Sequence, residues 1–290
     1  MIDLLDIRYV RLGTRDLVGA DRFAREVIGL ELARVEAGAH YYRSDDRDHT
    51  LVYFEGDPKD HTVGFELRQP GGLQAAASEL SHRGLAVQAG KADALEQRRV
   101  HGLVSFTDLS GNVIDLVERP SHSGRRHFPS RDAGITGFSH VGLCSTDAPR
   151  DEAFWCGVLG ARISDRIGDA ALLRIDPVHH KVALFPTTRA GIQHVNHQVA
   201  GIDDVMRAWY QLRERGVKIV FGPGRHPTSG AVFLYFEGPD GMVFEYSTGV
   251  RHIAPQDEAS YRPRQFPSVP SSFCMWGSLP DIPEFRKGPA

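Results

Sequence analysis

The chain has 290 residues, enough for two domains of about 130–150 residues that could each bury a core. Its 34 basic and 37 acidic residues leave a net charge of −3, which gives no reason to expect a nucleic-acid or membrane partner. The three cysteines show no paired spacing, and the first residues, MIDLLDIRYV, carry charges where a secretory signal would be apolar. We therefore expect a globular protein of the cytoplasm.

The first half, residues 1–118, predicts a strand, a helix, two or three strands, a second helix and a closing hairpin. The first strand is IRYVRL, and the helix VGADRFAREVIG ends at Gly29, a residue type typical of helix C-termini. The second helix is GGLQAAASELSHRG, and the hairpin turns through LSGN.

Residues 119–134 are rich in proline, serine and arginine, which indicates a linker. Residues 135–250 then repeat the order of elements in the first half. The strand GFSHVGL leads to the helix APRDEAFWCGVLG, the second helix is IDDVMRAWYQLRERG, and the last hairpin turns through GPDG. Residues 251–290 form a proline-rich tail whose aromatic residues predict that it folds over a domain or a neighbouring subunit.

The two halves are an internal repeat. YVRL at Tyr9–Leu12 matches HVGL at His140–Leu143, which lies 131 residues further along the chain. FTDLSGNVIDLVE at 106–118 matches FEGPDGMVFEYST at 236–248, which lies 130 residues further along. Matches in the same order at a nearly constant offset indicate two copies of one fold, with strands curled into a half-barrel and helices outside.

Three ligand-type side chains occupy equivalent strand positions in the second half only. They are His140, His194 and Glu245, and their counterparts in the first half are Tyr9, Thr62 and Asp115. Two imidazoles and one carboxylate are the ligand set of a facial-triad iron site. Because the same backbone positions in the first half carry non-ligands, the fold alone does not demand this set, and we predict a metal site in the second half.

His197 competes with His194 for the place of the second ligand. The two residues are three apart on one strand, so their side chains point to opposite faces and only one can be a ligand. We favour His194 because its counterpart Thr62 also begins the inward face of a strand. In the last strand, Phe244 and Tyr246 point away from Glu245 and are expected to pack in the core.

These residues resemble the type I extradiol ring-cleavage dioxygenases of the vicinal oxygen chelate superfamily. The resemblance covers about residues 5–250 and rests on HVGL, H-x-x-H-Q-V, GRH…Y and FEYS in the second half. It implies an α+β fold of two domains, each a paired βαβββ half-barrel repeat. The N-terminal domain (1–118) would lack metal, and the C-terminal domain (135–250) would hold Fe(II), or alternatively Mn(II), on His140, His194 and Glu245.

The resemblance also assigns three catalytic residues, namely His180, His226 and Tyr235. His180 would be the acid/base near the oxygen site, and His226 and Tyr235 would hydrogen-bond the substrate oxygen. Three departures leave alternatives open. Lys181 stands where related enzymes often carry serine, and the loop to His194 is shorter than expected, so His179 stays an alternative to His180. Pro227 and Thr228 follow His226 where biphenyl-type members tend to carry Asn-Asp. Because His226 comes after a Gly-rich turn, it could alternatively serve only to cap that turn.

The implied activity is meta cleavage of a catechol-type ring with O2 by a homo-oligomeric enzyme of aromatic catabolism. Two other functions stay open on the same fold. One is another metal-dependent vicinal oxygen chelate enzyme, such as a glyoxalase or a thiol transferase, although those usually share ligands between two modules. The other is a non-catalytic binding protein, for which His180, His226 and Tyr235 would be superfluous.

Overall fold

The computed structural model describes residues 1–36 and 38–286. The elements of the first half are β1 (Leu4–Thr14), α1 (Leu17–Arg22), the π-helical turn η1 (Phe23–Ile28), β2 (Glu31–Glu36), β3 (Ala39–Arg43), β4 (Leu51–Glu55), β5 (His61–Leu67), α2 (Leu73–His82), β6 (Val87–Ala89), α3 (Ala92–Arg98), β7 (Gly102–Thr107) and β8 (Val113–Glu118). The segment between residues 119 and 134, predicted as a linker, contains neither helix nor strand.

The elements of the second half are β9 (Ile135–Ser145), α4 (Ala148–Gly157), β10 (Arg162–Ile167), β11 (Ala170–Arg174), β12 (Val182–Pro186), β13 (Ile192–Val199), α5 (Ile202–Glu214), β14 (Ile219–Arg225), β15 (Val232–Glu237), η2 (Pro239–Gly241) and β16 (Val243–Thr248). The tail adds η3 (Pro255–Asp257), β17 (Arg264–Phe266), α6 (Pro270–Phe273) and α7 (Pro283–Arg286). Both predicted hairpins are present, as β7–β8 and β15–β16.

Each half forms one mixed sheet, and the fold is α+β as predicted. The strand order is β2-β3-β4-β1-β5-β8-β7-β6 in the first sheet and β14-β15-β16-β13-β9-β12-β11-β10-β17 in the second. In both sheets the first and fifth strands of the half (β1 with β5, β9 with β13) pair antiparallel, and each also pairs in parallel with the last strand of its own βαβββ unit. Each half therefore contains two βαβββ units.

The prediction of two or three strands after the first helix was too low, because four follow it in each half. Strands β3, β4, β11 and β12 have only five residues each, and nearly all of these are buried. Short strands that are buried on both faces lack the polar–apolar alternation that marks a half-exposed strand. Helix α3 was also not predicted.

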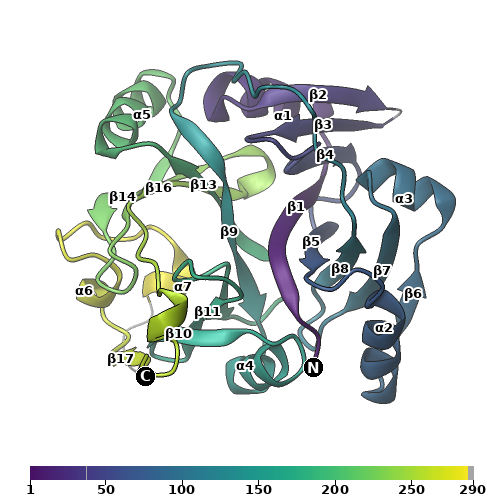
Figure 1. Ribbon diagram of the computed structural model, residues 1–290. Helices are drawn as coiled ribbons and strands as arrows, with labels where there is room; N and C mark the ends of the chain where they lie inside the picture. Colours follow the sequence, from purple (N-terminus) through teal and green to yellow (C-terminus); the bar gives the residue numbers. More distant parts are fainter. Residues whose placement is uncertain (37, 287–290) are drawn as a thin grey trace.

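The two halves share one hydrophobic core, although the chain length had suggested a separate core for each. Strands β1 and β9 lie side by side in the centre of the molecule (Figure 1). Trp155 of α4 packs against Phe65 of the first half, with ring centroids 5.5 Å apart, and Phe23 of η1 packs against Phe244 of the second half at 5.7 Å. Because the first helix of each half packs against the other half, the hydrophobic core continues across the boundary between them.

The second sheet curves strongly. In its strand order β12 and β14 are five places apart, which in a flat sheet would separate them by about 24 Å. Phe285 of α7 nevertheless contacts Phe185 of β12 at 5.0 Å and Phe221 of β14 at 5.9 Å, measured between ring centroids. The sheet therefore wraps round a common interior, which the tail closes on one side (Figure 1).

Candidate metal centre

His140, His194 and Glu245 meet in the interior of the second sheet. They come from β9, β13 and β16, which are neighbours in the sheet. The Nε2 atoms of the two histidines are 3.0 Å apart, and Oε2 of Glu245 lies 3.1 Å from Nε2 of His140 and 3.4 Å from Nε2 of His194. All three side chains are buried, at 3 % exposure or less. The structure thus places the three predicted ligands together.

The spacing of these three atoms suits a metal ion. Ligand atoms about 2.1 Å from a metal and at right angles to one another lie about 3.0 Å apart. Oε2 of Glu245 is buried without a hydrogen-bond partner, a costly state for a carboxylate oxygen that coordination to a cation would relieve. Two nitrogens and one oxygen on one face of an octahedron leave the opposite face open to substrate.

The ionisation of the ligands also suits a cation. Burial lowers the pKa of His194 to about 3, so its ring is neutral at physiological pH. Burial alone would raise the pKa of Glu245, but the neighbouring imidazoles of His140 and His226 hold it well below its usual range. The site therefore presents a neutral imidazole and a carboxylate without needing any proton to leave, which favours metal binding.

Two neighbours orient the ring of His194. Its Nδ1 donates to Oε1 of Gln193, which leaves the lone pair on Nε2 for the metal. Gly142 lies opposite on β9, and a Cβ atom at this position would come within 2.5 Å of Nδ1 of His194. The glycine of the HVGL motif is therefore needed for the close approach of this ring to β9.

His180, His226 and Tyr235 lie around the three ligands. The ring of His180 is 4.3 Å from that of His140 between centroids, and Nε2 of His226 is 3.6 Å from Oε1 of Glu245. The hydroxyl of Tyr235 is 3.2 Å from Nε2 of His226. Burial, followed by the charge of Glu245, raises the pKa of Tyr235 well above 10, so this phenol keeps its proton at any working pH.

The remaining histidines occupy other places. His197 packs against Phe138 at 6.0 Å on the far side of β13, and His179 lies behind His180 with its Nε2 on Asp165. His61 is buried at the start of β5, where its Nδ1 donates a hydrogen bond to the carbonyl of Lys59.

Comparison with known proteins shows which proteins this chain is similar to. A sequence profile described as the Glyoxalase/Bleomycin resistance protein/Dioxygenase superfamily matches residues 137–246, which contain all three ligands. An iron-dependent extradiol dioxygenase of Rhodococcus jostii (strain RHA1) is 28% identical, over 95% of this chain and 97% of the relative. A biphenyl-2,3-diol 1,2-dioxygenase of Paraburkholderia xenovorans (strain LB400) is 27% identical, over 87% and 90%. The chain is thus similar to extradiol dioxygenases over nearly its whole length.

Solved structures share the fold of this chain. A halotolerant catechol dioxygenase superposes with a TM-score of 0.87 at 22% identity, over 97% of both chains. The Mn(II)-bound glyoxalase from Novosphingobium aromaticivorans also gives 0.87 at 22% identity, over 100% of this chain and 96% of the other. The fold of an extradiol dioxygenase is thus shared with an enzyme of different activity, and function has to be argued from the site.

Two of the first-half counterparts of the ligands, Tyr9 and Asp115, belong to a hydrogen-bonded cluster. Tyr9 donates to Oδ2 of Asp115 at 2.8 Å, and Arg98 reaches the same oxygen at 2.6 Å. Ser105 hydroxyl also bonds Asp115, whereas Thr62 lies opposite Arg11 on the β1–β5 ladder. The guanidinium of Arg98 supplies the positive charge that the buried carboxylate needs.

His49 is the first-half counterpart of His180. Replacing it should make the free energy of unfolding less dependent on pH between pH 7 and pH 5. Burial lowers the pKa of His49 to about 4, whereas the unfolded chain titrates near 6.5. Between these values only the unfolded chain binds the proton, so the free energy of unfolding falls as the pH falls through this window. For this one group the loss from pH 7 to pH 5 is about 2 kcal/mol.

Urea unfolding at both pH values would measure the effect. The His49→Phe variant, whose ring can keep the stacking on Tyr9, should lose less stability than the parent protein by about that amount. An equal loss in both proteins would show that His49 titrates alike in the folded and unfolded chain.

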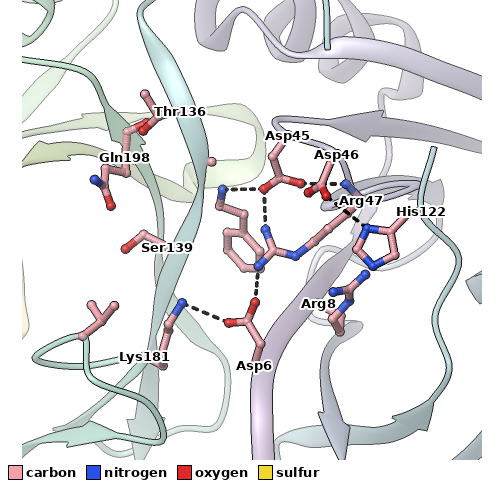
Figure 2. A pocket seen from close by; sticks show the side chains of 13 residues that line it. Asp6, Arg8, Asp45, Asp46, Arg47, His122, Thr136, Ser139, Lys181 and Gln198 are labelled. Atoms are coloured by element: carbon pink, nitrogen blue, oxygen red, sulfur yellow. Dashed lines mark hydrogen bonds and ion pairs between the residues drawn. The ribbon is translucent and has the colours of Figure 1, made fainter. Parts of the chain in front are cut away.

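Lys181 was noted in the sequence as a departure from related enzymes, and the structure gives it partners. Its ammonium lies 2.9 Å from Oδ1 of Asp6 on β1 (Figure 2) and 3.3 Å from Oδ2 of Asp176. Asp6 also bonds Arg47, which in turn bonds Asp45 (Figure 2). The residue after His180 is therefore tied to the first half of the chain through a charged cluster at the boundary.

The tail reaches the metal centre, which the sequence left open. The carbonyl of Phe273 accepts a hydrogen bond of 2.7 Å from Nδ1 of His226, so Nδ1 carries a proton. Phe285 packs against Tyr235 with ring centroids 5.9 Å apart. No spacing in the sequence indicated these contacts, because they join segments that share no repeat.

Proposed function

We propose that the protein is a non-haem Fe(II)-dependent extradiol dioxygenase that cleaves a catechol-type ring with O2 in the catabolism of aromatic compounds. The observation that carries this proposal is the buried triad of His140, His194 and Glu245 with His180, His226 and Tyr235 around it. A triad alone would suit many metal enzymes. Three additional proton-handling groups next to an open face suit a reaction that moves protons as well as electrons.

When bound, ferrous iron supplies a Lewis acid for the diol and one-electron chemistry for dioxygen. The protein contributes orientation and proton transfer. His180, neutral because burial and then the neighbouring His140 lower its pKa, can accept a proton from a diol hydroxyl. Tyr235 keeps its proton and can donate a hydrogen bond to a substrate oxygen. We propose His180, His226 and Tyr235 as the catalytic residues on these grounds.

A glyoxalase or thiol transferase is the runner-up. The likeness to the Mn(II)-bound glyoxalase keeps this alternative open for the fold, and Mn(II) remains an alternative to Fe(II) because hard nitrogen and oxygen ligands accept both. The cluster of Tyr9, Asp115 and Arg98 favours the dioxygenase, because all ligands then come from one half of the chain.

An anaerobic preparation tests the function directly. We expect about one iron per chain and, on addition of a catechol and air, oxygen uptake together with a yellow ring-fission product. Each substrate of a panel of substituted catechols should consume one O2 per ring cleaved. A preparation that holds neither iron nor manganese, and consumes no oxygen with any catechol, would refute the proposal.

We also propose that the protein is a homo-oligomer of the cytoplasm. Met275, Trp276 and Leu279 are exposed together on the tail, which favours contact with a second copy. The three cysteines are unpaired, as in a reducing compartment. Among the described residues, no helix is long and apolar enough to cross a membrane. Light scattering would decide the subunit number, and a monomer would contradict the first part of this proposal.

A further inference from the structure

Asp165 is a buried carboxylate behind the metal centre that sequence analysis did not single out. It lies on β10 with no exposed side-chain surface. Burial by itself would raise the pKa of this carboxyl, but its hydrogen bonds with His179 and Arg264 outweigh burial and lower the pKa. Arg264 donates to it from the backbone N–H at 2.9 Å and from Nη2 at 2.6 Å, and Nη2 of Arg251 donates at 3.1 Å. An ionised carboxylate in this position can only accept hydrogen bonds.

His179 joins Asp165 to His180. Its Nε2 lies 2.9 Å from Oδ2 of Asp165, and its Nδ1 lies 3.1 Å from Nδ1 of His180. Because the carboxylate only accepts, Nε2 of His179 must carry a proton. Burial lowers the pKa of His179, so the ring is neutral and has a single N–H. Its Nδ1 is therefore a hydrogen-bond acceptor.

The tautomer of His180 follows from the same inventory of donors and acceptors. Since Nδ1 of His179 accepts, Nδ1 of His180 has to donate. In a neutral ring the proton on Nδ1 leaves Nε2 with a free lone pair. The ring of His180 packs against the ring of His140. Because we propose His180 as the acid/base of the reaction, the free lone pair on its Nε2 is the site that would accept the proton.

We propose that Asp165 and His179 are positioning residues that hold His180 in the tautomer with Nδ1 protonated and Nε2 free to accept a proton. Arg251 and Arg264 keep the carboxylate charged and in place. The catalytic consequence rests on the proposed function, whereas the tautomer itself does not. A merely structural role for His179 would require only that it fill its space, and either tautomer of His180 would then serve.

Nuclear magnetic resonance of the protein loaded with Zn(II), which is diamagnetic, tests the tautomer without any turnover. Two-bond proton–nitrogen correlations in ¹⁵N-histidine-labelled protein report which ring nitrogen is protonated, and the spectrum of His180→Gln assigns the signals. We expect His180 to be protonated on Nδ1 alone. A proton on Nε2 of His180, or on both nitrogens of His179, would overturn the proposal even if the enzyme is an active dioxygenase.

Kinetics test the consequence. In His179→Phe we expect kcat to fall about 10²-fold with KM and iron content little changed, since an ill-placed acid/base loses rate rather than binding. In His179→Gln, whose amide can both donate to Asp165 and accept from His180, part of the rate should return. The matched control is His197→Phe, because His197 is a buried histidine that packs against Phe138 and whose ring nitrogens have no hydrogen-bond partner.

These outcomes separate the two proposals. If His179→Phe lowers kcat no more than His197→Phe does, His179 has no positioning role. If the parent protein turns over no catechol at all, the proposed function fails, while the spectrum of His180 still decides the tautomer.

Discussion

His194→Ala should leave anaerobic purification with little or no iron, and its dioxygenase activity should be lower by about 10³-fold or more. The two remaining ligands cannot hold the ion on one face, and the Lewis-acid contribution of the metal, several kcal/mol, is lost with it. Metal analysis and oxygen uptake on the same preparation measure both effects.

His197→Ala is the matched control for this experiment. His197 is a second buried histidine on the same strand, and neither of its ring nitrogens has a partner, so its removal creates a comparable cavity without touching a ligand. We expect this variant to keep about one iron per chain. Equal iron loss in both variants would mean that β13 had been disrupted, and iron retention in His194→Ala would exclude His194 as a ligand.

Tyr235→Phe should keep its iron and lose about 10²-fold in kcat, with KM within a few-fold of the parent value. The substitution preserves the ring among Phe221, Phe233 and Phe285 and removes only the hydroxyl beside His226. A donor directed at a reacting oxygen contributes about 10²–10³ in rate. Steady-state kinetics with iron content determined on each preparation give the comparison.

Tyr246→Phe provides the corresponding control. Tyr246 lies next to Glu245 on β16 but points the other way, and its hydroxyl donates to the carbonyl of Ile28 at 2.6 Å. Its loss should lower stability by about 1 kcal/mol and leave kcat unchanged. If Tyr235→Phe turns over at the parent rate, the role proposed for this phenol is wrong.

The internal repeat in the sequence was sufficient to predict that the three ligand-type residues lie close together in one sheet. Positions that match at a constant offset fall on equivalent strands, and β9, β13 and β16 are hydrogen-bonded neighbours. Strand alternation separated His194 from His197 for the same reason. Local chemistry likewise located both hairpins and the four main helices.

The features that could not be predicted depend on contacts between distant segments, which leave no local pattern in the sequence. Helix α4 and the turn η1 each pack against the opposite half of the chain. Phe273 and Phe285 of the tail contact residues of the metal centre. All of these contacts join segments that are far apart in the chain. In the sequence, Asp165 has no feature that separates it from the other charged residues of the strand RISDRI. Only the pairing of β17 with β10, which places Arg264 beside it, shows that it is a buried, hydrogen-bonded carboxylate. The short buried strands were undercounted because they carry no alternation.

The packing of α7 has a consequence for how tightly a substrate can be held. Phe285 contacts Phe185 and Tyr235, and Tyr235 is one of the residues that we propose to act on the substrate. If the substrate ring packs against the surface that Phe285 covers, docking of α7 and binding of the substrate become linked equilibria. In that case the observed affinity would be the intrinsic affinity multiplied by the fraction of molecules whose helix is undocked. Each further 1.4 kcal/mol or so of docking free energy would weaken apparent binding about tenfold.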